Sequence, residues 1–147
     1  MKTCRRCSVE KEDHHFYLSK DNRDGLSSWC RACKTAYNNR DRQRVKLSDP
    51  ILYKWRNLKT SATQQGIPFN VTVEHLKSIW SGRCAIFGNE ISLNPKDLRM
   101  AAELDKKIPS KGYTIGNVHW VCHRANRLKD NGNIEEFRKI IRYLEES

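Results

Sequence analysis

The sequence predicts a small α+β protein in three segments, and three observations carry that prediction. Residues 1–35 hold two Cys-x-x-Cys pairs, residues 36–80 are basic with a helical pattern, and residues 81–147 combine short apolar strands with helices. With 147 residues and 37% hydrophobic side chains, the chain has room for one domain or two small ones, but no large apolar core. Small modules of this kind usually need a staple such as a bound metal.

The two cysteine pairs of the first segment are Cys4-x-x-Cys7 and Cys30-x-x-Cys33. A two-residue gap lets both thiolates of a pair reach one tetrahedral ion, so two pairs predict one closed, structural Zn²⁺ site in a zinc ribbon. Disulfides are the alternative, but this spacing in a chain expected to be cytoplasmic favours metal. The neighbouring arginines are expected to favour the thiolate forms and to contact phosphates: Arg5, Arg6 and Arg31.

The middle segment is predicted to be a basic helical linker. A polar helix continues from the second cysteine pair, and its exposed arginines are further candidates for phosphate contact: Arg40, Arg42 and Arg44. Asp49 is expected to cap a second helix whose first residue is Pro50. Residues 69–73 alternate apolar and polar side chains as in a short strand, and a helix with an apolar stripe follows up to Trp80.

The last segment ends in a helix for which Asn133 is the expected N-cap, with acidic residues in the first turn. Four apolar side chains at helical spacing predict its buried face: Phe137, Ile140, Ile141 and Leu144.

The whole chain is strongly basic, with a formal net charge of +11, an isoelectric point near 9.6 and a mean hydropathy of −0.81. Clustered Lys and Arg release condensed counterions when they meet phosphates, so a nucleic acid is the expected partner. No apolar run approaches the roughly 20 residues of a membrane span, and the N-terminus lacks a signal-peptide apolar region. We therefore expect a soluble, cytoplasmic protein without membrane contact.

Residues 104–129 carry most of the functional information. An acidic residue closes an apolar stretch at Asp105, a Gly112-Tyr113 loop follows, and Asn117 precedes a short apolar strand that leads into a helix holding Asn126. In this order, the features resemble the HNH nuclease motif, or ββα-metal finger, over roughly residues 83–137. Residues 1–35 resemble the zinc-ribbon modules that precede HNH domains in phage and bacterial proteins.

The resemblance implies a metal-dependent endonuclease that hydrolyses phosphodiester bonds of DNA, in the host cytoplasm if a phage encodes it. Asp105 and Asn126 match the motif's ligands for one Mg²⁺ or Mn²⁺, which are hard cations that prefer oxygen donors. Asn117 matches the central Asn that orients the water-activating His, and Lys129 matches a basic residue that touches phosphate. The implied partner is double-stranded DNA, bound mainly through its backbone, whereas target sequence and oligomeric state are not determined by the sequence.

One position departs from the family pattern, because Lys106 stands where the family has its water-activating His. A Lys is normally protonated at neutral pH and cannot accept a proton in that form. His119 on the second strand, His123 on the helix and hydroxide bound to the metal are the alternative bases. If none serves, the chain is a zinc-stabilised DNA-binding protein that has lost cleavage; a third hypothesis is RNA binding through the zinc module.

A second departure concerns zinc, since many HNH domains carry a further zinc site made of Cys-x-x-Cys pairs. Here Phe87 follows Cys84 and Ala125 follows Cys122 at the positions of the second cysteines. The paired loss predicts an apolar contact in place of metal, with Cys84 and Cys122 as buried thiols.

Overall fold

The computed structural model describes residues 1–130 and 132–146, and it divides into two compact units, Met1–Asp49 and Pro50–Ser147. The predicted α+β class is confirmed. The basic helical segment 36–80 is shared between the units, since its first helix belongs to the first unit and the following helices to the second. In the part of the chain that the structure describes, no helix combines the length and apolar character needed to span a membrane.

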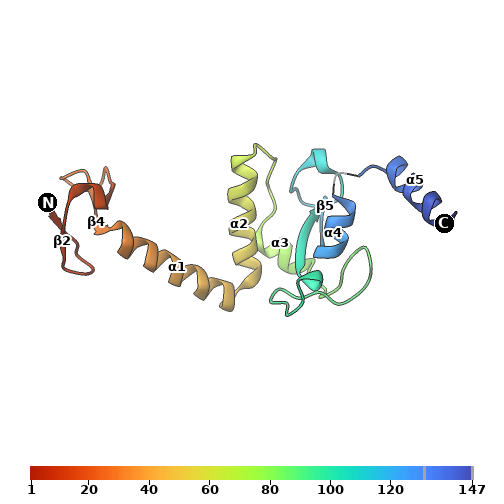
Figure 1. Ribbon diagram of the computed structural model, residues 1–147, viewed down its shortest axis with the longest axis horizontal. Helices are drawn as coiled ribbons and strands as arrows, with labels where there is room; N and C mark the ends of the chain where they lie inside the picture. The colour runs from red at the N-terminus through yellow and green to blue at the C-terminus, as the bar shows by residue number, and fades with distance from the viewer. Residues whose placement is uncertain (131, 147) are drawn as a thin grey trace. The chain divides into compact units, whose positions relative to one another are not determined.

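The first unit contains two small antiparallel hairpins and one long helix (Figure 1). Its elements are β1 (Lys2–Thr3), β2 (Glu10–Lys11), a 3-10 turn at Asp13–His15, β3 (Phe16–Leu18), β4 (Leu26–Cys30) and α1 (Arg31–Ser48). β1 pairs with β2 and β3 with β4, and α1 runs on directly from the end of β4. The core is very small, because its buried residues are Cys4, Phe16 and Cys30, with Trp29 packed against them.

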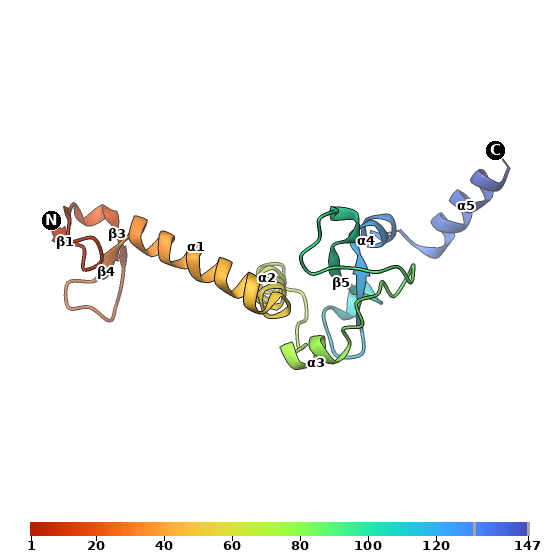
Figure 2. The same cartoon turned by 90° about the horizontal axis from the view of Figure 1, so that it is seen from below.

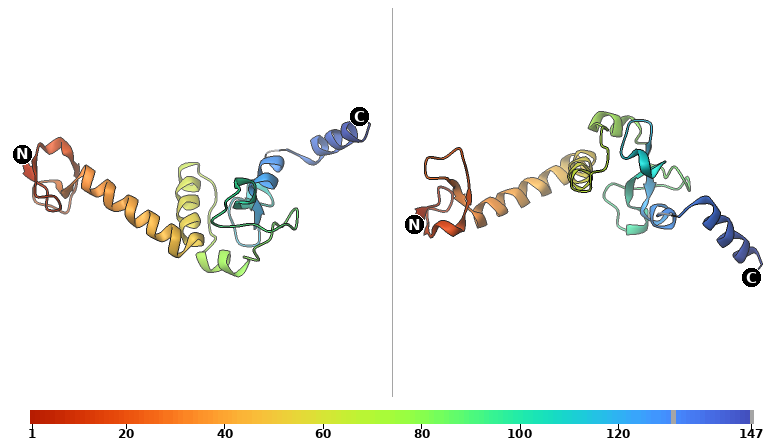
Figure 3. Two further views of the ribbon diagram at one scale, coloured as in Figure 1. Left: turned by 60° about the horizontal axis from the view of Figure 1, so that its bottom comes forward. Right: turned by 90° about the horizontal axis from the view of Figure 1, so that it is seen from above.

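The described residues of the second unit form four helices and a hairpin. Its elements are α2 (Pro50–Gln64), α3 (Val73–Ser78), a 3-10 turn at Leu98–Met100, β5 (Ala102–Lys106), a 3-10 turn at Pro109–Lys111, β6 (Val118–Cys122), α4 (His123–Lys129) and α5 (Ile134–Glu145). β5 and β6 form a regular antiparallel ladder, and α4 lies against the hairpin (Figure 2; Figure 3). This β5–β6–α4 unit has the ββα arrangement that the resemblance implies.

Tryptophan packing holds the core of the second unit together. Trp120 of β6 is 2% exposed, its indole N–H donates to the Leu76 carbonyl oxygen at 3.0 Å, and its ring meets Trp80 edge-on at 5.2 Å. Val71 and Val121 are buried in the same cluster. The cluster therefore packs α3 against the hairpin and holds β6, the strand that also carries His119, in place.

Two expectations about secondary structure and packing are wrong. Residues 69–73 do not form a strand: Phe69 makes an isolated bridge to Tyr113, and Thr72 instead caps α3 by accepting from the His75 N–H at 3.1 Å. The last helix begins with the predicted Asn133 cap, which forms a capping box with Glu136. However, α5 has no buried residue, and its apolar side chains are half-exposed or exposed: Phe137, Ile140, Ile141 and Leu144.

Candidate functional site

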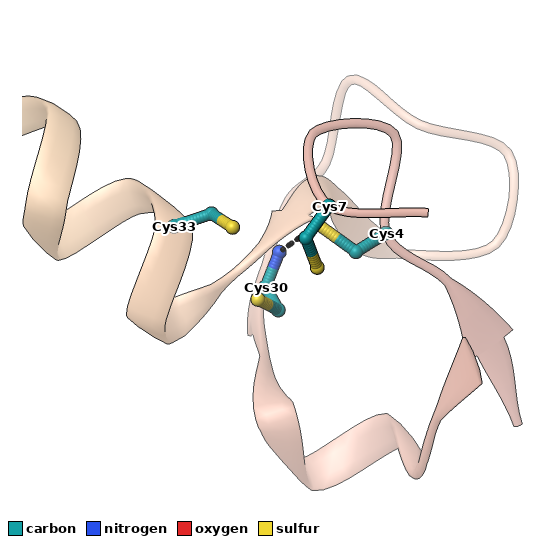
Figure 4. A group of neighbouring side chains, drawn as sticks. All are labelled: Cys4, Cys7, Cys30 and Cys33. Carbon is teal, nitrogen blue, oxygen red and sulfur yellow. Dashed lines mark hydrogen bonds between the residues drawn. The ribbon is translucent and has the colours of Figure 1, made fainter. Parts of the chain in front are cut away.

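The four cysteines of the first unit converge on one point. Their sulfur atoms all lie within 4.8 Å of one another, between the turn after β1 and the start of α1 (Figure 4). Cys4 and Cys30 are buried, whereas Cys7 is exposed. Zinc–sulfur bonds of about 2.3 Å put the ligands of a tetrahedral ion about 3.8 Å apart, so this donor set fits one structural zinc ion.

Backbone amides favour the thiolate form of the buried sulfur. Burial raises the pKa of Cys4, but N–H groups of Cys30, Cys7 and Arg6 outweigh it and lower the pKa to about 6. The Cys30 N–H donates to the Cys4 sulfur at 3.2 Å and the Arg6 N–H at 3.4 Å. A thiolate already stabilised in this way is the form that binds zinc.

Sequence reasoning missed a basic residue that contacts the cluster. Lys11 donates from Nζ to the Cys30 sulfur at 3.4 Å. The backbone N–H of Cys33 and this Lys11 contact both lower the pKa of Cys30. Nothing in the sequence pairs Lys11 with a cysteine, since the contact depends on how the two hairpins of the unit fold together.

The arginines predicted beside the cysteines lie against aromatic rings. Arg6 lies over the Trp29 ring at 5.1 Å and Arg31 over the Tyr17 ring at 4.9 Å, while the backbone N–H of Arg5 bonds the Ser28 carbonyl. All the predicted phosphate-binding arginines are exposed: Arg5, Arg6, Arg31, Arg40, Arg42 and Arg44. Arg44 also pairs with Asp41 of α1 at 2.7 Å.

In the second unit, Asp105 is the centre of a polar cluster on the face of the hairpin that contacts α4. It lies opposite His119 in the ladder, and its Oδ2 is 3.0 Å from His119 Nε2. Lys129 of α4 contacts both carboxylate oxygens at 3.0 and 2.9 Å and also donates to the Lys106 carbonyl at 2.8 Å. Asp105 is only 8% exposed, so Lys129 balances a nearly buried charge.

Glu103 is a second carboxylate on this face, and sequence reasoning did not find it. Its Oε1 is 2.7 Å from His123 Nδ1, and its Oε2 accepts from Asn126 Nδ2 at 2.5 Å. Strand side chains alternate between faces, so a residue two positions before Asp105 must share its face. This alternation is the sequence signal from which Glu103 could have been predicted.

The predicted cation ligands, Asp105 and Asn126, thus hold different partners. Asp105 contacts His119 and Lys129, whereas Asn126 contacts Glu103. A cation held by Asp105 must displace Lys129 from at least one carboxylate oxygen. Among the described residues, only the four cysteines bring three or more Cys, His or carboxylate ligands together, so a cation in the second unit depends on the oxygens of Asp105 and Asn126. Carboxylate and amide oxygens are the donor types that a hard divalent cation prefers.

Lys106 lies on the opposite face of β5 from these carboxylates, next to the loop. Its Nζ lies 5.0 Å from the centroid of the Tyr113 ring. Burial raises the pKa of Tyr113, and the charges of Asp105 and Glu103 raise it further. Tyr113 therefore stays protonated at neutral pH and presents its ring to the Lys106 ammonium group.

Asn117 is buried and closes the loop between β5 and β6. Its amide nitrogen donates to the carbonyls of Ile108 and Gly112 at 2.9 and 2.8 Å, and its oxygen accepts from the Ile108 N–H at 3.0 Å. At Gly112 the backbone φ is +67°, and a Cβ would stand 2.3 Å from the Pro68 oxygen, so the position requires glycine. The structure therefore places Asn117 in contact with loop backbone.

A hollow of about 400 Å³ opens beside Glu103, between α2 and the ββα unit. Polar and apolar side chains of α2, β5, the loop after β5 and α4 line it: Tyr53, Lys54, Asn57, Leu58, Ser61, Glu103, Leu104, Tyr113 and Asn126. Glu103 and Asn126 are thus reachable from solvent beside the polar side of α2.

The chain was compared with known protein families, curated proteins and solved structures. No family model matches the sequence, and no curated protein matches it. Among solved structures, the chain is similar to the rare-cutting HNH restriction endonuclease PacI, with a TM-score of 0.44 and 21% sequence identity over 96% of this chain and 90% of that chain.

Proposed function

We propose that this protein is a metal-dependent DNA endonuclease that hydrolyses phosphodiester bonds. The observation that carries the proposal is the ββα unit itself: Glu103, Asp105 and His119 share one face of the hairpin, and His123 and Asn126 of α4 contact Glu103. Such a set suits hydrolysis of a phosphodiester assisted by Mg²⁺ or Mn²⁺, and the charge of +11 suits a polyanionic substrate.

In this proposal Asp105 and Asn126 hold the divalent cation, which stabilises the negative charge that develops on the scissile phosphate. His119 is the favoured base, because Asp105 accepts its Nε2–H and so leaves the Nδ1 lone pair to take a proton from water. His123 is the second candidate, through the nitrogen that does not contact Glu103. Asn117 maintains the loop around these groups.

Double-stranded DNA is the proposed partner, contacted mainly through its backbone. Exposed arginines of the zinc module and α1 support this binding, since phosphate contacts position a protein without reading sequence. The four-cysteine metal group favours action in a reducing compartment such as the cytoplasm, where thiolates stay available to metal.

The test is nicking of supercoiled plasmid by the zinc-loaded chain with Mg²⁺ or Mn²⁺. We expect Asp105→Ala to reduce the rate at least about 10²-fold, because it removes a cation ligand and the partner of the favoured base. Asp97→Ala is the matched control, since Asp97 is a half-exposed carboxylate whose partner is Arg99 and not a residue of the Asp105 cluster, and it should cut at the wild-type rate. Equal rates for wild type and Asp105→Ala would overturn the proposal.

A second candidate function is DNA binding without cleavage, and two contacts favour it. Lys106 stands in place of the usual base and lies over Tyr113, and Lys129 pairs with Asp105. Tight DNA binding with no metal-dependent cutting would support this function. If the chain is an enzyme, Lys106→His should preserve or raise its rate, whereas complete loss would assign Lys106 a specific role in cleavage.

A further inference from the structure

Glu103 of β5 contacts two polar side chains of α4, those of His123 and Asn126. One oxygen faces His123 Nδ1 at 2.7 Å, and the other accepts from Asn126 Nδ2 at 2.5 Å. His123 and Asn126 are one helical turn apart, so a single carboxylate spans both.

These contacts determine which atoms of the two partners carry available lone pairs. An ionised carboxylate only accepts hydrogen bonds, so His123 must present Nδ1–H and Asn126 must present its NH₂ group to Glu103. In neutral His123, Nε2 is then the acceptor atom. In Asn126, Oδ1 is turned away from Glu103 and is available to a cation.

We infer that Glu103 is the positioning residue of the cation site, holding His123 in its Nδ1–H tautomer and Asn126 with its amide oxygen turned toward the cation. Metal ligands in proteins are commonly oriented by a carboxylate of this kind, and removing it typically costs 10- to 100-fold in metal affinity. The inference rests on the proposed function for the presence of the cation. The orientation of the two side chains can be tested without it.

A purely structural role, in which Glu103 only attaches α4 to the hairpin, explains the contacts less well. The helix is already anchored by buried Ala125 and by Cys122, whose sulfur caps the Ala125 N–H at 3.3 Å. The His123 N–H also bonds the Ala101 carbonyl at 2.8 Å. The Glu103 side chain is 29% exposed and lines the 400 Å³ hollow, a position suited to a ligand site.

The first experiment measures the His123 tautomer by ¹⁵N NMR of imidazole nitrogens in the zinc-loaded full chain, without added divalent cation, at a pH where histidines are neutral. Glu103→Gln keeps the size of the side chain but offers one oxygen acceptor in place of two. We expect wild type to show the Nδ1–H tautomer and Glu103→Gln to shift toward Nε2–H. Glu135→Gln is the control, since Glu135 is an exposed carboxylate of α5 paired with Arg138, and it should leave the His123 signals unchanged.

The second experiment measures Mn²⁺ affinity of the same variants. We expect about 10- to 100-fold weaker binding for Glu103→Gln, unchanged binding for Glu135→Gln, and partial recovery for Glu103→Asp, which keeps both oxygens. An unchanged His123 tautomer in Glu103→Gln, or unchanged Mn²⁺ affinity, would overturn the inference. If the wild-type chain binds no Mn²⁺, the proposed function fails, and the tautomer measurement still decides whether Glu103 orients His123.

Discussion

The two units contain the same local structure around a pair of cysteines, but they stabilise it differently. In the first unit the Cys4 N–H bonds the Val9 carbonyl and the Ser8 N–H bonds the Cys4 carbonyl. In the second, the Cys84 N–H bonds the Asn89 carbonyl and the Gly88 N–H bonds the Cys84 carbonyl. Ser8 and Gly88, each four residues after its cysteine, both have positive φ, at +56° and +72°.

The second cysteine of each pair matches as well. Cys30 ends β4 and is the N-cap of α1, and Cys122 ends β6 and is the N-cap of α4. The backbone N–H of Cys30 bonds the sulfur of Cys4. Burial raises the pKa of Cys84, but the backbone groups of Phe87, Cys122 and Ile86 outweigh it and lower that pKa. The two units share a pattern of backbone hydrogen bonds, and this pattern does not require similar side chains. The sequence therefore shows no repeat beyond the Cys-x-x-Cys pairs.

The difference lies in what surrounds the sulfurs. Cys7 and Cys33 complete a four-sulfur cluster in the first unit, whereas Phe87 and Ala125 occupy the corresponding positions in the second. These two side chains line an apolar hollow of about 300 Å³ with Leu128 and Phe137. Cys84 and Cys122 are both buried, as predicted. The same backbone arrangement thus occurs beside a four-sulfur group with a minimal core and beside a tryptophan core with two cysteines.

The largest expected effect is loss of the first unit's structure when its zinc is removed by a chelator or its binding by Cys4→Ala. Structural zinc contributes about 10–16 kcal/mol in comparable modules, and this unit has only three buried core residues besides Val45 of α1. Amide NMR of the full chain should show collapse of signals from residues 1–35 and retention of those from the second unit. A folded first unit without metal would contradict the comparison.

Removing the Trp120 ring should destabilise the second unit. Trp120→Ala removes a ring that is 2% exposed and its hydrogen bond to Leu76, so we expect a loss of about 3–5 kcal/mol in the free energy of unfolding. Urea denaturation monitored by NMR should show this loss in the second unit alone. Trp29→Ala is the matched change in the first unit, and the zinc there should limit its effect.

Adding the two missing cysteines should convert the second arrangement into the first. We expect the double variant Phe87→Cys/Ala125→Cys to bind two zinc ions per chain, whereas wild type and each single variant bind one. At a free zinc concentration of 100 times the dissociation constant, the added ion would stabilise the second unit by about 2.7 kcal/mol. Metal analysis after gel filtration gives the stoichiometry, and one zinc in the double variant would show that the two arrangements are not equivalent.

The smallest expected effect is that of Cys84→Ala. A buried free thiol acts as a small apolar side chain, so its loss should lower the free energy of unfolding of the second unit by about 1 kcal/mol and leave its NMR spectrum folded. The same substitution at Cys4 is expected to unfold its unit. Comparable losses at Cys4 and Cys84 would refute the distinction between a metal-closed and an apolar arrangement.

The sequence predicted features that depend on local chemistry. The Cys-x-x-Cys spacing and the Asn133 N-cap involve short-range rules, the ββα order is what the resemblance to the HNH motif implies, and the structure contains each of them. Spacing alone was sufficient because a knuckle, a cap or a hairpin with its following helix is determined within a few residues.

The sequence could not predict features that depend on distant partners. Residues 69–73 alternate like a strand but find no neighbouring strand, since Phe69 contacts Tyr113 through a single bridge. The apolar stripe of α5 predicts burial, yet burial requires a surface to cover it. Likewise, the pairing of Lys129 with Asp105 joins positions 24 residues apart and depends on how α4 lies on the hairpin.

Titration of Mn²⁺ into the zinc-loaded chain, followed by electron paramagnetic resonance of the free ion, decides whether the Asp105 face binds a cation. In the proposed function, the first unit holds a fixed zinc ion and the Asp105 face of the second unit holds an exchangeable cation. We predict one Mn²⁺ per chain, lost in Asp105→Asn and retained in Asp97→Asn. Absence of bound Mn²⁺ in wild type, or undiminished binding in Asp105→Asn, would contradict the assignment of this face as the cation site.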